Sequence, residues 1–156
     1  MQFLCVAEPV YGQTNILVSG ISSVQHQKKP IRVGAERMEV LLPLLAGKNV
    51  GLVVNQSSLV GKVHLVDTLR AQGICVARIF PPEHGFRGAG DAGELIADDQ
   101  DAATGAPIIS LYGKRRKPHP EDFEGLDVVV FDIQDVGVRF YTYISTLFYV
   151  LEACAE

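Results

Sequence analysis

The sequence lacks the features of several large protein classes. Its 14 basic residues are outnumbered by 18 acidic ones, and the formal net charge of −4 provides no positive field that could hold a phosphate backbone. No apolar run approaches the roughly 20 residues that a membrane-spanning helix needs. We therefore expect neither a nucleic acid partner nor a transmembrane segment.

Cysteine is scarce as well. Cys5, Cys75 and Cys154 show no close pairing, and an odd number argues against a disulfide framework. Cys75 and Cys154 fall within apolar patterns and are predicted to be small core residues. No second histidine or cysteine stands at the spacing of metal ligands, so no metal site is expected.

A glycine-rich phosphate loop is also missing. The first predicted strand, residues 49–54, ends in Asn-Gln-Ser-Ser, and neither Gly-x-Gly-x-x-Gly nor Gly-x-x-x-x-Gly-Lys-Ser/Thr occurs. The nucleotide-binding function that is common in α/β folds therefore loses its main support, and no cofactor is predicted.

The chain divides into a leader and one domain. Residues 1–30 show no sustained periodicity and are predicted to be a poorly ordered leader or the remnant of an export signal, because residues 3–7 are apolar but no basic segment precedes them. The domain proper is expected to cover residues 31–156.

Within that domain, strand and helix patterns alternate. Apolar residues at helical spacing predict helices over residues 35–45, 63–71 and 143–155, with a helical turn at 120–123. Short apolar runs predict strands at residues 49–54, 74–80, 107–111 and 127–133. The last helix is expected to bury Ile144, Leu147, Phe148 and Leu151. This order is typical of an α/β fold, a parallel sheet with flanking helices.

The predicted site lies at the carboxyl ends of the strands, where open parallel sheets bind their ligands. Those ends carry Asn55, the pair Glu83-His84, Tyr112 and residues 132–139. Residues 81–106 form a long predicted loop, and such loops inside a compact domain often carry function.

The first cluster of candidate residues is Glu83, His84 and Arg87, in a glycine-flanked turn directly after a strand. A partly desolvated Glu83 could act as a general acid, or could simply cap a helix or form a salt bridge. His84 could bind substrate, orient Glu83 or bond to the loop backbone. Arg87 could clamp a ligand carboxylate, or tie down an acidic stretch that includes Asp101.

The second cluster follows the strand at 127–133. Asp132 and Gln134 share one side of that strand, and a buried network joining the loops is one interpretation. The functional alternative is that Gln134, Asp135 and Arg139 grip hydroxyl or amide groups of a sugar-like ligand on which Tyr141 stacks.

Specific strings in the sequence resemble the bacterial exo-β-N-acetylmuramidases, a family that was long described only as a domain of unknown function. The resemblance extends from about Arg32 to the C-terminus. It rests on VGLVVNQ (50–56), FPPEHGFRG (80–88), AGE (92–94), TGAP (104–107), SLYG (110–113) and VFDIQDVGVRFYTYISTL (130–147).

The resemblance implies a Rossmann-like N-terminal domain and removal of terminal N-acetylmuramic acid from the non-reducing end of peptidoglycan fragments. It implies that Glu83 is catalytic and that the substrate is a muramyl saccharide, with Asn55, His84, Arg87, Asp135 and Arg139 at positions that line the cleft. Tyr141 joins the predicted substrate-binding residues as the group that stacks on the sugar. It also implies an extracytoplasmic location, although the N-terminus leaves a cytoplasmic one open.

The second catalytic group and the function itself both have alternatives at this stage. Family members continue for about another domain, so the chain is expected to lack a C-terminal wall of the cleft, and the second carboxyl group of the reaction could be Glu94, Asp132 or Asp135. The rival function is a non-catalytic muropeptide-binding domain, in which Glu83 and Arg139 only hold sugar hydroxyls. The oligomeric state is not predicted.

Overall fold

The computed structural model describes residues 31–82, 87 and 99–156. Its main sheet has five strands in the order β5-β6-β4-β1-β7. They are β1 (Asn49–Val54), β4 (Cys75–Ile79), β5 (Asp99–Gln100), β6 (Pro107–Ile108) and β7 (Val128–Asp132). β1 pairs in parallel with β4 and β7, and β4 pairs in parallel with β6. The predicted parallel sheet is confirmed.

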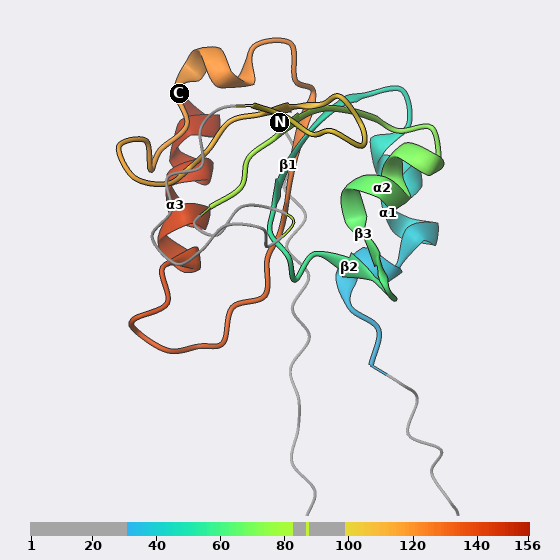
Figure 1. Ribbon diagram of the computed structural model, residues 1–156, viewed down its shortest axis with the longest axis horizontal. Coiled ribbons are helices and arrows are strands. Elements are labelled where there is room, and N and C mark those ends of the chain that lie inside the picture. The colour runs from blue at the N-terminus through green and yellow to red at the C-terminus, as the bar shows by residue number, and fades with distance from the viewer. Residues whose placement is uncertain (1–30, 83–86, 88–98) are drawn as a thin grey trace, which may run out of the picture.

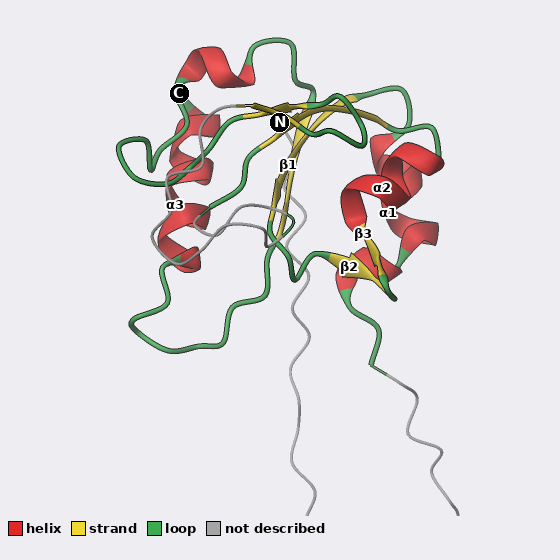
Figure 2. Ribbon diagram, viewed as in Figure 1, coloured by secondary structure: helices red, strands yellow, loops and turns green. Residues whose placement is uncertain are grey.

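Helices cover both faces of this sheet (Figures 1 and 2). They are the 3₁₀ turns η1 (Gly34–Glu36) and η2 (Pro120–Phe123) and the α-helices α1 (Met38–Leu45), α2 (Leu65–Ala71) and α3 (Tyr143–Ala155). One core cluster joins α1 and α2 to the sheet, whereas the other contains Phe123 of η2 and Val150 of α3. The fold is therefore a three-layer, Rossmann-like α/β arrangement.

β1 occupies the centre because its sequence suits a strand buried on both faces. Val50, Leu52, Val53 and Val54 are all fully buried, as is typical of a central parallel strand. A Cβ at Gly51 would stand 2.8 Å from Leu126 Cδ1, so only glycine fits there without a shift of the neighbouring side chains. The predicted bounds of β1 are confirmed.

The last helix has the predicted bounds, but the predicted buried face is wrong. Ile144, Phe148 and Leu151 are 63%, 61% and 39% exposed, and Leu147 is half-buried. The face packed against the sheet carries Tyr143, Thr146, Val150 and Ala153. α3 is apolar around most of its circumference, so periodicity could not tell which side meets the sheet.

Other differences are local. The predicted helix at 35–45 is divided into η1 and α1 at Arg37, whose ψ of 57° is not helical. A small antiparallel hairpin, β2 (Leu59–Val60) and β3 (Val63–His64), precedes α2, so this helix begins two residues later than predicted. β5 lies inside the stretch that was predicted to be all loop and pairs with β6 in the antiparallel sense.

The two described cysteines do not both belong to the core. Cys75 is exposed at the start of β4, which contradicts the prediction, whereas Cys154 is half-buried against the second core cluster. Burial raises the pKa of the Cys154 thiol to about 11. Among the described helices, none combines the length and the apolar composition needed to cross a bilayer. The predicted leader, residues 1–30, lies outside the described residues.

Candidate active site

The carboxyl ends of β1, β4 and β7 lie at one edge of the sheet. Val54 at the end of β1 pairs with Asp132 at the end of β7, and Leu52 pairs with Ile79 of β4. After β4 the chain runs through Pro81, whose carbonyl accepts a hydrogen bond of 2.8 Å from the Leu111 backbone N–H. Glu83 and His84 follow within two and three residues, but both lie outside the described residues.

Asn55 closes the end of β1 in a tight turn. It is 1% exposed, and its side-chain oxygen accepts hydrogen bonds from the Ser57 backbone N–H at 2.9 Å and from Ser57 Oγ at 2.7 Å. Its backbone N–H donates to Ser58 Oγ at 3.0 Å, and that hydroxyl donates to the Asp132 carbonyl. Because both acceptor positions of Oδ1 are used, a ligand could bind Asn55 only through its amide N–H groups.

His64, which the sequence did not single out, connects this turn to α2. Its Nε2 lies 3.0 Å from the carbonyl oxygen of Asn55, and its Nδ1 accepts a hydrogen bond of 3.2 Å from the Val66 backbone N–H. These two bonds require the tautomer with the proton on Nε2. Histidine is not a preferred N-cap residue, so no sequence signal pointed to this capping role.

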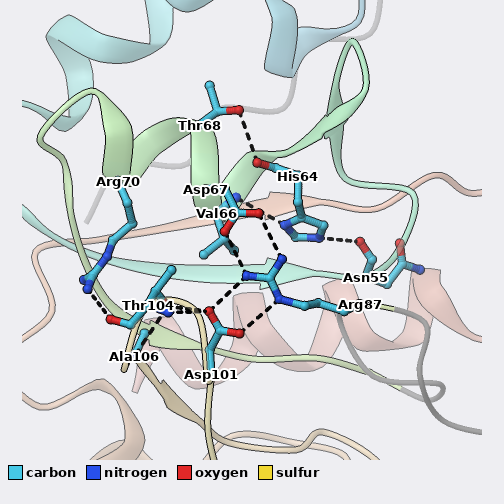
Figure 3. A network of polar contacts seen from close by, with 10 residues as sticks. All are labelled: Asn55, His64, Val66, Asp67, Thr68, Arg70, Arg87, Asp101, Thr104 and Ala106. Atoms are coloured by element: carbon cyan, nitrogen blue, oxygen red, sulfur yellow. Dashed lines mark hydrogen bonds and ion pairs between the residues drawn. The ribbon is translucent and has the colours of Figure 1, made fainter.

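Arg87 lies between two carboxylates (Figure 3). Its Nη1 and Nη2 donate to Asp67 at 2.9 and 2.8 Å, and its Nε and Nη2 each donate to Asp101 at 3.0 Å. Hydrogen bonds to Asp67 and then to Asp101 raise the pKa of Arg87 above its usual range. The hydrogen bond from Arg87 in turn lowers the pKa of Asp67.

Asp101 is the buried member of this group, with a side chain that is 4% exposed. Burial by itself would raise its pKa, but hydrogen bonds from Arg87 and Thr104 outweigh that effect and hold the pKa of Asp101 at about 2. Thr104 contributes its backbone N–H at 3.0 Å and its hydroxyl at 2.5 Å. Arg87 was predicted either to bind a ligand carboxylate or to hold the acidic stretch that includes Asp101, and the geometry favours the second role. Substrate binding by Arg87 stays a prediction.

Asp132 ends β7 at the same sheet edge. Burial raises the pKa of its carboxyl group to about 6. Gln134 is exposed, and its backbone N–H donates to Ser57 Oγ at 3.0 Å. The link between the loops after β1 and β7 is thus made by backbone and serine groups, rather than by the buried Gln134 side chain that one interpretation required.

The other predicted binding residues are exposed on the segment between β7 and α3. Asp135 Oδ1 accepts a hydrogen bond of 2.6 Å from the Gly137 backbone N–H. Arg139 is exposed, and Tyr141 is 40% exposed between the rings of Phe140 and Tyr143, each with its centroid 5.9 Å away. Over the described ranges, no group of three or more His, Cys, Asp or Glu side chains is placed to hold a metal ion.

Fold and site together define a class: a Rossmann-like α/β domain whose described polar groups lie at the carboxyl ends of β1 and β7. A family model described as exo-beta-N-acetylmuramidase NamZ, N-terminal, matches residues 50–156, and the chain belongs to this family. It is 42% identical over 144 residues to the peptidoglycan beta-N-acetylmuramidase NamZ of Bacillus subtilis (strain 168). That match covers 86% of this chain and 34% of the relative, so the chain spans about a third of the relative's length.

Two solved structures have a similar fold. A crystal structure of a DUF1343 family protein from Bacteroides fragilis superposes with a TM-score of 0.66 at 38% identity, over 78% of this chain and 31% of that one. A second DUF1343 family protein from the same organism gives a TM-score of 0.65 at 41% identity, over 73% and 28% of the two chains. The resemblance and the fold class predicted from the sequence are both confirmed.

Proposed function

We propose that this chain is the N-terminal part of a glycosidase that releases terminal N-acetylmuramic acid from the non-reducing end of peptidoglycan fragments. The observation that carries the proposal is the 42% identity to a protein named as a peptidoglycan beta-N-acetylmuramidase. The substrate is then a muramyl saccharide derived from peptidoglycan, and the site of action is outside the cytoplasm, where peptidoglycan lies.

Glu83 is the proposed general acid. Glycoside hydrolysis commonly uses two carboxyl groups, one of which protonates the leaving oxygen and therefore needs a raised pKa. Glu83 follows β4, and Asp132 ends β7, with β1 between these two strands. β4 and β7 are thus two strand spacings of about 4.8 Å apart in the sheet. Among the described carboxyl groups, Asp132 is the best candidate for the second carboxyl group of the reaction, because it lies at this sheet edge and its pKa of about 6 is near neutral pH.

Arg139 is the proposed partner of the lactyl carboxylate that distinguishes muramic acid from glucosamine. A guanidinium group binds a carboxylate through two parallel hydrogen bonds. Arg87 already makes such bonds to Asp67 and Asp101, whereas Arg139 is exposed on the segment between β7 and α3. His84 and Asn55 donate to sugar hydroxyl or amide groups, Asp135 accepts from them, and Tyr141 stacks on the sugar.

Hydrolysis of a chromogenic N-acetylmuramic acid glycoside tests the proposal. The assay compares this chain, the same chain extended by the part of the Bacillus relative outside the match, and each of these with Glu83→Gln. Glu121→Gln, which changes an exposed glutamate on η2, is the matched control. We expect the extended protein to turn the glycoside over, Glu83→Gln to lower the rate at least about a hundredfold, and Glu121→Gln to leave it unchanged.

The rival function is muropeptide binding without catalysis. Calorimetric binding of a muramyl saccharide that is unaffected by Glu83→Gln, with no turnover by the extended protein, would support binding and overturn the proposal. Turnover that survives Glu83→Gln would keep the glycosidase but remove Glu83 from its centre.

A further inference from the structure

β7 forms an edge of the main sheet. Its one strand partner among the described residues is β1. A groove with a volume of about 330 Å³ runs along β7 between α1 and α3. All residues from Val128 to Ile133 line it, together with apolar residues from both helices. An open strand edge is a ready template for pairing with another strand.

The helices on the two sides of this groove present apolar residues that nothing in the described part of the chain covers. Ile144, Phe148 and Leu151 recur at i, i+4 and i+7 along α3, and each is at least 39% exposed. Val40 and Leu44 of α1 stand four residues apart and are both 37% exposed. A strand placed beside β7 would be covered by α1 on one face and by α3 on the other, as parallel strands require.

Chain topology gives the direction in which such a strand would arrive. The chain passes from β1 through α2 to β4, and α2 lies on the face of the sheet opposite to α3 (Figure 1). Crossovers between parallel strands are almost always right-handed. With α3 on the face opposite to α2, a right-handed crossover from β7 through α3 proceeds away from β1 and ends beside the open edge of β7.

We propose that this groove, defined by β7, α1 and α3, receives a further parallel β-strand from the polypeptide that makes up the rest of the longer family members. The curated relative has about two thirds of its length outside the match, since the match covers 34% of it. The expected occupant is an apolar strand, with side chains that alternate between Val40 and Leu44 on one side and Ile144 and Leu147 on the other. Its backbone would extend the sheet by one strand.

The test uses this 156-residue chain and, as a separate polypeptide, the part of the Bacillus relative that lies outside the match. Binding is measured by calorimetry, and amide hydrogen exchange is followed in the peptides that contain β7. We expect complex formation to slow exchange across Val128–Asp132 by about tenfold or more. Ile144→Lys should weaken binding about tenfold or more, because it places a charge in an apolar contact.

Val63→Lys is the matched control, because Val63 is 52% exposed on β3, outside the groove. It should leave the affinity unchanged, and circular dichroism establishes that both variants are folded. Absence of binding, binding without slower exchange at β7, or equal binding by Ile144→Lys would overturn the proposal. If circular dichroism shows that the separate polypeptide is unfolded, exchange across Val128–Asp132 is compared between this chain and the extended protein instead, and equal exchange in the two would overturn the proposal. So would a dimer of this chain, seen by light scattering, whose β7 edge is already protected and excludes the added polypeptide. None of these readouts depends on glycosidase activity.

Discussion

Arg87 and Asp67 form a bidentate pair across twenty residues of sequence, with Nη1 2.9 Å from Oδ2 and Nη2 2.8 Å from Oδ1. Asp67 lies in the first turn of α2, where a negative charge also favours the helix dipole. Arg87 belongs to the same short motif as Glu83, four residues earlier. The pair therefore anchors Arg87 to α2, and Asp101 anchors it to the turn between β5 and β6.

Replacement of Arg87 by lysine distinguishes a structural tie from a substrate clamp. A lysine cannot make two parallel hydrogen bonds to Asp67 and still reach Asp101, so we expect Arg87→Lys to lower the free energy of unfolding by about 1–2 kcal/mol. Urea denaturation measures this loss. A variant of unchanged stability in which the extended protein no longer prefers muramic over glucosamine termini would instead show that Arg87 binds substrate.

The two carboxylates that bind Arg87 differ in burial, and they should differ in how much they contribute to the stability of the fold. The Asp101 side chain is 4% exposed and that of Asp67 is 34% exposed, so Asp101→Asn is expected to destabilise the fold more than Asp67→Asn. The pKa of Asp101 is about 2 in the fold, below the ordinary aspartate value of 3.8. Its stabilising contribution is therefore complete above about pH 4 and is lost as the pH falls through 2.

Denaturation of wild type and Asp101→Asn at several pH values between 7 and 2 tests this. The stability difference between them should be constant down to about pH 5 and should shrink below pH 4. A difference that grows on acidification would contradict the ion pair as the source of stability.

A side chain at Gly51 should force the neighbouring side chains to move. A Cβ there would stand 2.8 Å from Leu126 Cδ1 and 3.1 Å from Phe80 Cε2, so Gly51→Ala forces a shift in a packed core and should cost about 1–3 kcal/mol. Gly34→Ala is the matched control, because a Cβ at Gly34 meets nothing within 4 Å. Thermal unfolding of both variants measures the contrast, and equal melting temperatures would show that Leu126 and Phe80 adjust freely.

The central strands β1, β4 and β7 were predictable because their signal is local. β1 consists of an apolar run bounded by a glycine turn and by Asn55, and its sequence alone gives the correct bounds. The exposed face of α3 could not be predicted in the same way, because it depends on which elements pack against an almost wholly apolar helix. The hairpin β2–β3 was missed because each of its strands has only two residues.

The candidate site shows the same limit. The position of Asn55 and Asp132 follows from the rule that ligand-binding residues lie at the carboxyl ends of parallel strands. The partners of Arg87 could not be read completely from the sequence, because Asp67 is brought to it by the packing of α2 and looks like any exposed helix residue. His64 was missed because its cap to Val66 and its bond to Asn55 exist only once the hairpin and β1 are in place.

Asp132 should make the stability of the fold fall as the pH rises. Burial raises the pKa of its carboxyl group from 3.8 to about 6, so the folded state holds this proton more tightly than the unfolded chain does. Ionisation therefore opposes folding, and the penalty is absent below about pH 4, develops as the pH rises to 6 and is complete above it. Asparagine mimics the neutral acid. The free energy of unfolding of Asp132→Asn should therefore equal that of wild type at pH 4 and exceed it by about 1–2 kcal/mol at pH 7.5. Urea denaturation across this range measures the difference, and a difference that stays flat from pH 4 to 7.5 would show that the carboxyl group of Asp132 is hydrated rather than buried, which would remove it as the assistant of Glu83.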